Sequence, residues 1–279
     1  MTYENMENSL DRGGPITLYE FAIGTDEKPF RYTDSDKREF HEGVPWEKIP
    51  IQRGKIENSG SLTKVKFEIT VPKNLEIVRL YAAYPPSDVV YVRVLEGHYD
   101  DRDRQFLTVA AGRLLNVKIE QGRAILLCEP ATTSIRRPGL RRNWQRGCPL
   151  QLYGPACRAV RVDEECEVRS FDQNTIFVSA PAGGFLPGID AYANGILQWV
   201  NQDTARREVR SLLDGVAEDD GFRLRVAGPV FHVPETVFVT KGCSHTEEAC
   251  LLWHNNILNY GGQRWIPYKN PVGNLSVYF

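Results

Sequence analysis

Lys64-Val65-Lys66-Phe67-Glu68-Ile69-Thr70-Val71 alternates polar and apolar residues from end to end. Successive side chains of a strand point to opposite faces of a sheet, so this alternation predicts a strand with one buried face. Runs rich in β-branched and aromatic residues lie on both sides of it, and turn residues and prolines separate them. The surrounding sequence is therefore typical of an antiparallel β domain.

The runs that flank this stretch are the candidate strands 17–21, 30–33, 78–81, 89–95, 107–119 and 124–128. Gln121-Gly122 separates the last two and is typical of a hairpin turn. Tyr99–Arg104 is a charged segment between two runs and predicts a loop. These features predict an antiparallel β domain over residues 15–135, preceded by a flexible arm over residues 1–14.

A second set of candidate strands covers 175–179, 195–200, 208–212, 222–226 and 235–240. Residues 192–213 also have helical propensity, but Gly195 and the turn residues 201–204 favour a hairpin. We expect a small β-barrel-like domain over residues 166–240. Ser244 precedes Glu247 at the spacing of a capping box and predicts a short helix over residues 245–256. The predicted fold class is mainly β with a minor helical part.

The bulk composition excludes several classes of protein. The 279 residues carry a formal net charge of −2, which provides no global field for nucleic acid or an anionic membrane. No stretch approaches the roughly 18 apolar residues of a membrane span. The polar N-terminus does not resemble a signal peptide, so we expect synthesis in a cytoplasm, where disulfides are disfavoured. The six cysteines then indicate metal, catalysis or core packing.

Four of the cysteines form two pairs, Cys148 with Cys157 and Cys243 with Cys250. The gaps 149–156 and 244–249 are longer than the two to four residues that are typical of a zinc knuckle. The longer gaps are suited to a larger group in which several metal atoms are each bound by a cysteine, such as an iron–sulfur cluster. Glycines and prolines beside each pair allow backbone N–H groups to approach the sulfurs. The alternative is that several of these cysteines are ordinary buried residues.

Arginines are concentrated just before the first pair, and they surround Trp144. The cluster consists of Arg136, Arg137, Arg141, Arg142 and Arg146. We expect these side chains to offset the negative charge of a thiolate cluster and to lower the thiol pKa values. An interface surface and a contact with nucleic acid are the alternatives.

Other residues offer alternatives for the site. Cys166 follows Cys157 at the spacing of the first pair, whereas Cys128 ends an apolar run and fits a core. His245 lies between Cys243 and Cys250 and would complete a zinc site of three cysteines and one histidine. A cysteine peptidase would pair Cys148 with His232 or His245. His254 is assigned to the surface or to a helix end.

Two long motifs carry a resemblance to a known family. They are Arg141-Arg142-Asn143-Trp144-Gln145-Arg146-Gly147-Cys148-Pro149-Leu150-Gln151-Leu152-Tyr153-Gly154-Pro155-Ala156-Cys157, and Gly242-Cys243-Ser244-His245-Thr246-Glu247-Glu248-Ala249-Cys250 with the trailing Asn259-Tyr260-Gly261-Gly262. They resemble the hub proteins of phage tail tips, a family that includes the tail-tip assembly protein of lambda-like phages and a hub protein of gene transfer agents. Weaker landmarks, such as Leu18-Tyr19-Glu20-Phe21 and Ala111-Gly112-Arg113, extend the resemblance over about residues 16–270.

The resemblance implies a non-enzymatic structural protein of the virion, located at the tail tip or baseplate hub after assembly in the host cytoplasm. It implies a [4Fe–4S] cluster with Cys148, Cys157, Cys243 and Cys250 as ligands, and zinc is the alternative metal. It also implies a homotrimeric ring that contacts the distal tail protein, the central tail-tip protein and the tape measure protein. No membrane contact is expected, and nucleic acid only as DNA that passes through the lumen.

This sequence departs from the lambda-like members of the family because residues 158–242 separate the two cysteine pairs. We interpret residues 166–240 as an inserted β domain. Residues 136–165 and 241–279 then form the cluster-binding region.

Overall fold

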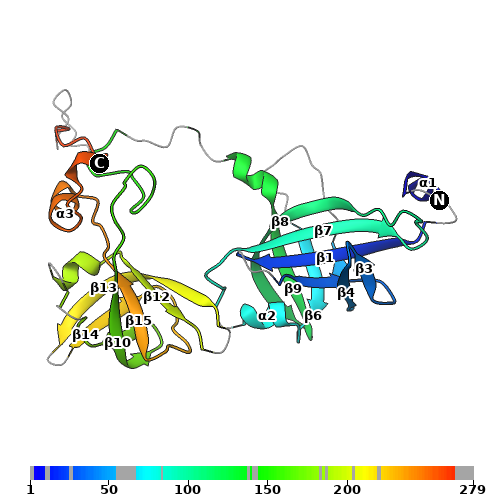
Figure 1. Ribbon diagram of the computed structural model, residues 1–279, viewed down its shortest axis with the longest axis horizontal. Coiled ribbons are helices and arrows are strands. Elements are labelled where there is room, and N and C mark those ends of the chain that lie inside the picture. The colour runs from blue at the N-terminus through cyan, green and yellow to red at the C-terminus, as the bar shows by residue number, and fades with distance from the viewer. Residues whose placement is uncertain are drawn as a thin grey trace. The chain divides into compact units, whose positions relative to one another are not determined.

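The computed structural model describes residues 3–9, 13–24, 28–54, 67–82, 84–136, 139, 144–181, 184–185, 188–202, 205–218 and 221–267. The chain divides into two compact units, Met1–Pro138 and Gly139–Phe279. Both units consist mainly of strands, which confirms the predicted fold class (Figure 1). Among the described residues, none of the helices has the length and apolar character that crossing a membrane requires.

The first unit contains a nine-stranded sheet with the order β3-β4-β2-β1-β7-β8-β9-β6-β5. Its strands are β1 (Pro15–Ile23), β2 (Phe30–Thr33), β3 (Glu39–His41), β4 (Val44–Lys48), β5 (Gln52–Arg53), β6 (Phe67–Pro72), β7 (Val90–His98), β8 (Leu107–Glu120) and β9 (Arg123–Pro130). The pairings are antiparallel except between β2 and β4. Short helices α1 (Tyr3–Glu7), α2 (Glu76–Leu80) and η1 (Ala131–Arg136) accompany the sheet.

Strand β6 has the alternation that the sequence predicts. Phe67, Ile69 and Val71 are buried, whereas the residues between them are exposed or half-buried. Residues 64–66 of the same predicted strand lie outside the described residues. The predicted hairpin turn between β8 and β9 is confirmed, because Gln121 and Gly122 have φ values of 45° and 82°.

One strand prediction in this unit is wrong. Residues 78–81 were expected to form a strand, but residues 76–80 form helix α2. Ile77 and Val78 are adjacent and both buried in the sheet core, which a half-buried strand with alternating faces does not allow. Burial of the whole turn of helix outweighs the β propensity of these residues. The predicted arm contains helix α1, in which Met6 is buried.

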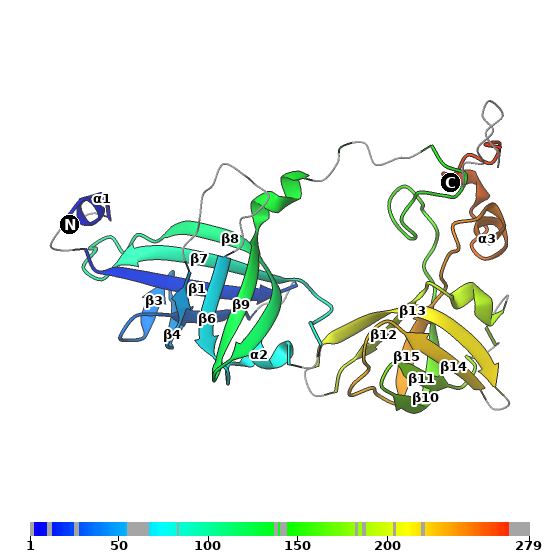
Figure 2. The same cartoon turned by 180° about the vertical axis from the view of Figure 1, so that it is seen from behind.

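The second unit contains a closed barrel with the strand order β10-β11-β14-β13-β12-β15 (Figure 2). Its strands are β10 (Asp163–Asp172), β11 (Thr175–Val178), β12 (Ile196–Val200), β13 (Arg207–Glu218), β14 (Gly221–Val226) and β15 (Thr236–Thr240). Trp199, Leu197 and Leu212 are buried in its core, and β12 pairs with β13 as the predicted hairpin. A helix over residues 192–213 is excluded by this pairing.

Short helices and an irregular segment complete the second unit. They are η2 (Ile189–Tyr192), α3 (Glu247–Leu252) and η3 (Ile257–Asn259), together with residues 144–162 before β10. The predicted helix start needs a correction, because Thr246 and not Ser244 caps α3. The Thr246 side chain accepts a hydrogen bond from Ala249 N at 3.2 Å.

Candidate metal centre

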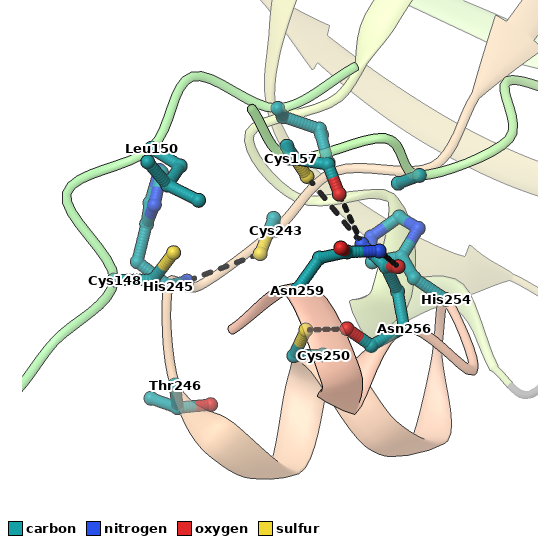
Figure 3. Close-up of a pocket in the computed structure, with 12 residues that line it drawn as sticks. Cys148, Leu150, Cys157, Cys243, His245, Thr246, Cys250, His254, Asn256 and Asn259 are labelled. Atoms are coloured by element: carbon teal, nitrogen blue, oxygen red, sulfur yellow. Dashed lines mark hydrogen bonds between the residues drawn. The ribbon is translucent and has the colours of Figure 1, made fainter. Parts of the chain in front are cut away.

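Cys148, Cys157, Cys243 and Cys250 line one pocket of the second unit. The first two lie on the irregular segment before the barrel, Cys243 follows β15, and Cys250 lies on α3. Figure 3 shows the four sulfurs pointing into the same space. The barrel, which separates the two pairs in sequence, returns the chain to the segment from which it started.

Backbone N–H groups donate to two of the sulfurs. Gly261 N lies 3.4 Å from Cys148 Sγ, and His245 N lies 3.3 Å from Cys243 Sγ (Figure 3 draws the second bond). N–H groups directed at sulfur stabilise a thiolate and tune a metal that the thiolate binds. The trailing Gly261 therefore belongs to the site, although it lies far from Cys148 in sequence.

Asn256 serves the other two cysteines. Its Nδ2 donates to the Cys157 carbonyl at 2.6 Å and lies 3.7 Å from Cys157 Sγ. The Cys250 thiol donates to the Asn256 carbonyl at 3.2 Å. The amino-acid sequence does not reveal the role of Asn256, because a lone Asn in a short loop carries no ligand pattern.

Direct hydrogen bonds join the two segments that carry the cysteines. Cys148 N donates to His245 O at 2.8 Å, and Tyr260 Oη donates to Arg146 O at 2.9 Å. Gln263 N donates to Gln145 O at 2.9 Å. The segments are therefore held together by protein contacts in addition to any bound metal.

The two glycines of the trailing motif are required by close packing. A Cβ atom on Gly261 would lie 2.8 Å from Leu150 Cγ. A Cβ atom on Gly262 would clash with Arg146 O and with Tyr260 Oη. Only residues without a side chain fit between the trailing segment and the loop that carries Cys148.

The barrel supports the pocket from the other side. Tyr153 Oη donates to Lys241 O at 2.7 Å, and His254 Nε2 lies 2.8 Å from Gly242 O. A Cβ atom on Gly242 would clash with Ala193 O, so the chain leaves the barrel in backbone contact with it. The position of Cys243 therefore depends on the barrel.

Two histidines line the pocket. His254 lies at the end of α3, as the sequence predicts, and packs edge-on against Tyr153 with ring centroids 5.9 Å apart. Burial lowers the pKa of His254, while its bond to Gly242 O opposes that shift. His245 also lines the pocket, and its backbone holds Cys148 and Cys243. His232 lies in the barrel loop after β14 and is not among the residues that line the pocket.

Two of the four pocket thiols have raised pKa values. Burial raises the pKa of Cys243. The hydrogen bond from His245 N lowers this pKa, and the neighbouring Cys148 and Cys157 raise it further. Burial and the same neighbours raise the pKa of Cys250 to about 11. Three of the five arginines that were expected to lower the thiol pKa values, Arg137, Arg141 and Arg142, lie outside the described residues, so that effect stays a prediction. A metal that binds such thiols displaces their protons, so its affinity depends on pH.

The arginine cluster is described only in part. Arg137, Arg141 and Arg142 lie outside the described residues, and nothing of the Arg136 side chain is described. Arg146 Nη1 lies 3.4 Å from Ile266 O, so this arginine ties the loop to the trailing segment. Trp144 is 78% exposed.

The remaining two cysteines lie elsewhere. Cys128 is buried in the core of the sheet, as expected, and Cys166 is buried in the core of the barrel. Burial raises the pKa of each thiol to about 12. The placement of Cys166 excludes it from the pocket that the other four cysteines line.

The donor set of the pocket suits thiolate ligation, either of a metal ion or of an iron–sulfur cluster. A single zinc ion requires four sulfurs each about 2.3 Å from it. Within the described part of the chain, no three His, Cys, Asp or Glu side chains lie close enough together to hold one metal ion. Four cysteines line the pocket and two of their sulfurs accept backbone N–H groups, which is a ligand type that both a zinc site and an iron–sulfur cluster use.

Comparisons with known proteins find a family model and solved structures that are similar to this chain. Residues 190–270 match the model of a family described as "Phage conserved hypothetical protein BR0599". One solved chain, from the "Virion of native gene transfer agent (GTA) particle", superposes with a TM-score of 0.72 and 15% sequence identity. The match covers 95% of this chain and 91% of that chain. A comparison with curated proteins finds no match.

These similarities have different ranges. The matched family segment includes Cys243 and Cys250, but it begins at residue 190, after the N-terminal unit and the first cysteine pair. The structural match extends over both units and shows that the chain shares its fold with a chain of a gene transfer agent virion.

Proposed function

We propose that this chain is a structural protein of a phage-type virion, located in the hub of the tail tip. We propose further that Cys148, Cys157, Cys243 and Cys250 hold a [4Fe–4S] cluster. The observation that carries the proposal is the convergence of four cysteines, from segments on both sides of a barrel, on one pocket with N–H donors. The fold shared with a gene transfer agent virion chain supports the location.

We propose that the site has a structural role and no catalytic one. A bound cluster would cross-link four thiolates and so tie the segment around residue 150 to the segment around residue 250. Gly261, His245 and Asn256 direct N–H groups at three of the sulfurs and disperse their negative charge. The hydrogen bonds that the Tyr153 and Tyr260 hydroxyls donate to backbone carbonyls position the same segments.

We propose that the N-terminal sheet forms part of a ring around the tail lumen. Three copies would close the ring, with the distal tail, central tail-tip and tape measure proteins as neighbours. The proposal assigns the chain no catalytic step. Exposed apolar side chains on the sheet, including Tyr91 at 54% and Ile119 at 58%, are compatible with burial between subunits.

Anaerobic purification of the full chain tests the cluster. We expect a brown protein with broad absorbance near roughly 400 nm and with iron and acid-labile sulfide in equal amounts, about four of each per chain. A colourless protein with one zinc ion per chain would overturn the cluster in favour of a zinc-stabilised binding module.

A second measurement tests the location. Particles purified from a host that expresses the tail genes should contain the chain, and cryo-electron microscopy should place three copies around the lumen at the tail tip. Absence of the chain from tails, or a peptidase activity lost in Cys148→Ser with the fold intact, would overturn the structural role.

A further inference from the structure

Asn256 contacts one cysteine of each pair. It immediately precedes η3, and its amide lies beside Cys157 while its backbone lies beside Cys250 (Figure 3). We infer that Asn256 is a positioning residue for the proposed cluster site. It holds the two cysteine pairs in place relative to each other, and it stabilises negative charge on the sulfur of Cys157. The inference rests on the proposed function, because it concerns the same four thiols.

The backbone of Asn256 fixes Cys250. Asn256 N donates to Cys250 O at 2.9 Å, and Cys250 Sγ donates to Asn256 O at 3.2 Å. These two bonds join Cys250, near the end of α3, to Asn256 in the segment that follows the helix. When Cys250 binds a metal as a thiolate, it has no proton to donate, but the bond from Asn256 N to Cys250 O remains.

The side chain of Asn256 fixes Cys157, which lies 99 residues earlier in the sequence. Asn256 Nδ2 is 2.6 Å from Cys157 O and 3.7 Å from Cys157 Sγ. The amide thus holds the backbone of Cys157 and also presents an N–H group to its sulfur. A donor to a ligating sulfur stabilises the more negative, reduced form of a cluster.

A third residue sets the orientation of the amide. Asn259 Nδ2 donates to Asn256 Oδ1 at 2.7 Å, so Oδ1 is occupied as the acceptor and Nδ2 faces Cys157. The first residue of the trailing Asn-Tyr-Gly-Gly motif therefore acts through Asn256. Metal-binding side chains often depend on such outer partners, whose loss weakens metal binding about 10- to 100-fold.

The test uses Asn256→Asp in the full chain, purified anaerobically beside the wild type. The substitution keeps the size of the side chain and removes its N–H donors, and it adds a negative charge near the Cys157 sulfur. Asn255→Asp is the matched control, because it adds the same charge to the exposed neighbouring residue. Asn256→Ala is a second variant that removes the donors without adding charge.

The measurements are the midpoint potential of the cluster and the rate of iron loss to a chelator. We expect a lower potential and iron loss about 10- to 100-fold faster in Asn256→Asp, with the control close to the wild type. Asn256→Ala should move both quantities in the same direction. A residue that only stabilised the fold would leave the potential unchanged in molecules that retain the cluster.

The possible results separate the inference from the proposed function. A wild type with iron and sulfide, but with both Asn256 variants equal to it in potential and iron loss, overturns the inference alone. A wild type without iron and sulfide overturns the proposed function and the inference together. If Asn256→Asp does not fold, as judged by far-ultraviolet circular dichroism, Asn256→Ala gives the result.

Discussion

The backbone N–H of Gly261 donates to the sulfur of Cys148 across 3.4 Å, although 113 positions separate the two residues in sequence. The bond depends on a residue without a side chain, because a Cβ atom at Gly261 would lie 2.8 Å from Leu150 Cγ. The trailing Gly-Gly motif is therefore part of the pocket that the four cysteines line and not only a turn.

Gly261→Ala should release iron about 10- to 100-fold faster than the wild type, because the added methyl group pushes the N–H donor away from Cys148. Iron transfer to a coloured chelator measures the rate. Gly139→Ala is the control, since its Cβ atom would meet no neighbour within 4 Å. Equal rates for Gly261→Ala and the wild type would show that this bond does not influence the cluster.

Gly242→Ala should destabilise the second unit by about 1–3 kcal/mol, because the new Cβ atom clashes with Ala193 O at the exit from the barrel. Urea unfolding followed by tryptophan fluorescence measures this change through buried Trp199. Gly188→Ala should be close to neutral, since the space around Gly188 is open. A neutral Gly242→Ala would mean that the barrel does not constrain Cys243.

Thr246→Ala should cost about 1 kcal/mol of stability, because the Thr246 hydroxyl caps α3 through Ala249 N. Ser244→Ala should cost less, since Ser244 contacts the Thr246 hydroxyl and does not bond the helix backbone. Thermal unfolding of both variants measures the difference. A larger loss of stability in Ser244→Ala than in Thr246→Ala would support the capping box that the sequence predicts.

Replacement of any pocket cysteine by serine should remove most of the cluster, because each thiolate would bind one of its iron atoms. Iron and sulfide analysis of Cys148→Ser, Cys157→Ser, Cys243→Ser and Cys250→Ser measures the loss. Cys128→Ala and Cys166→Ala should keep the colour, since both sulfurs lie in apolar cores away from the pocket. Bleaching in Cys166→Ala together with a coloured Cys157→Ser would show that the ligand set is wrong.

The buried thiol of Cys128 should make the first unit sensitive to alkali. Burial raises its pKa from 9.0 to about 12, so the unfolded chain loses this proton first as the pH rises. The stabilisation is therefore complete below pH 9 and declines between pH 9 and 12. Urea unfolding at pH 7 and pH 10 should show that the difference in free energy of unfolding between wild type and Cys128→Ala is smaller at the higher pH.

The N-terminal unit shows which features local sequence can predict. The alternation in β6 and the Gln121-Gly122 turn report on backbone geometry within a few residues, and the structure contains both. The strand predicted over residues 78–81 is wrong, because local β propensity favours a strand there whereas residues 76–80 form a helical turn buried against the sheet core. Contact with the sheet core decides between them, and that contact is not local.

The cysteine site divides in the same way. The sequence by itself determined two cysteine pairs with long gaps, flanked by small residues, and separated them from the apolar surroundings of Cys128. Only the tertiary structure placed Cys166 in the barrel core and brought Asn256, His254 and Gly261 to the pocket. The physical reason is that a strand pattern depends on neighbouring residues, whereas these contacts depend on how the closed barrel returns the chain to its starting segment.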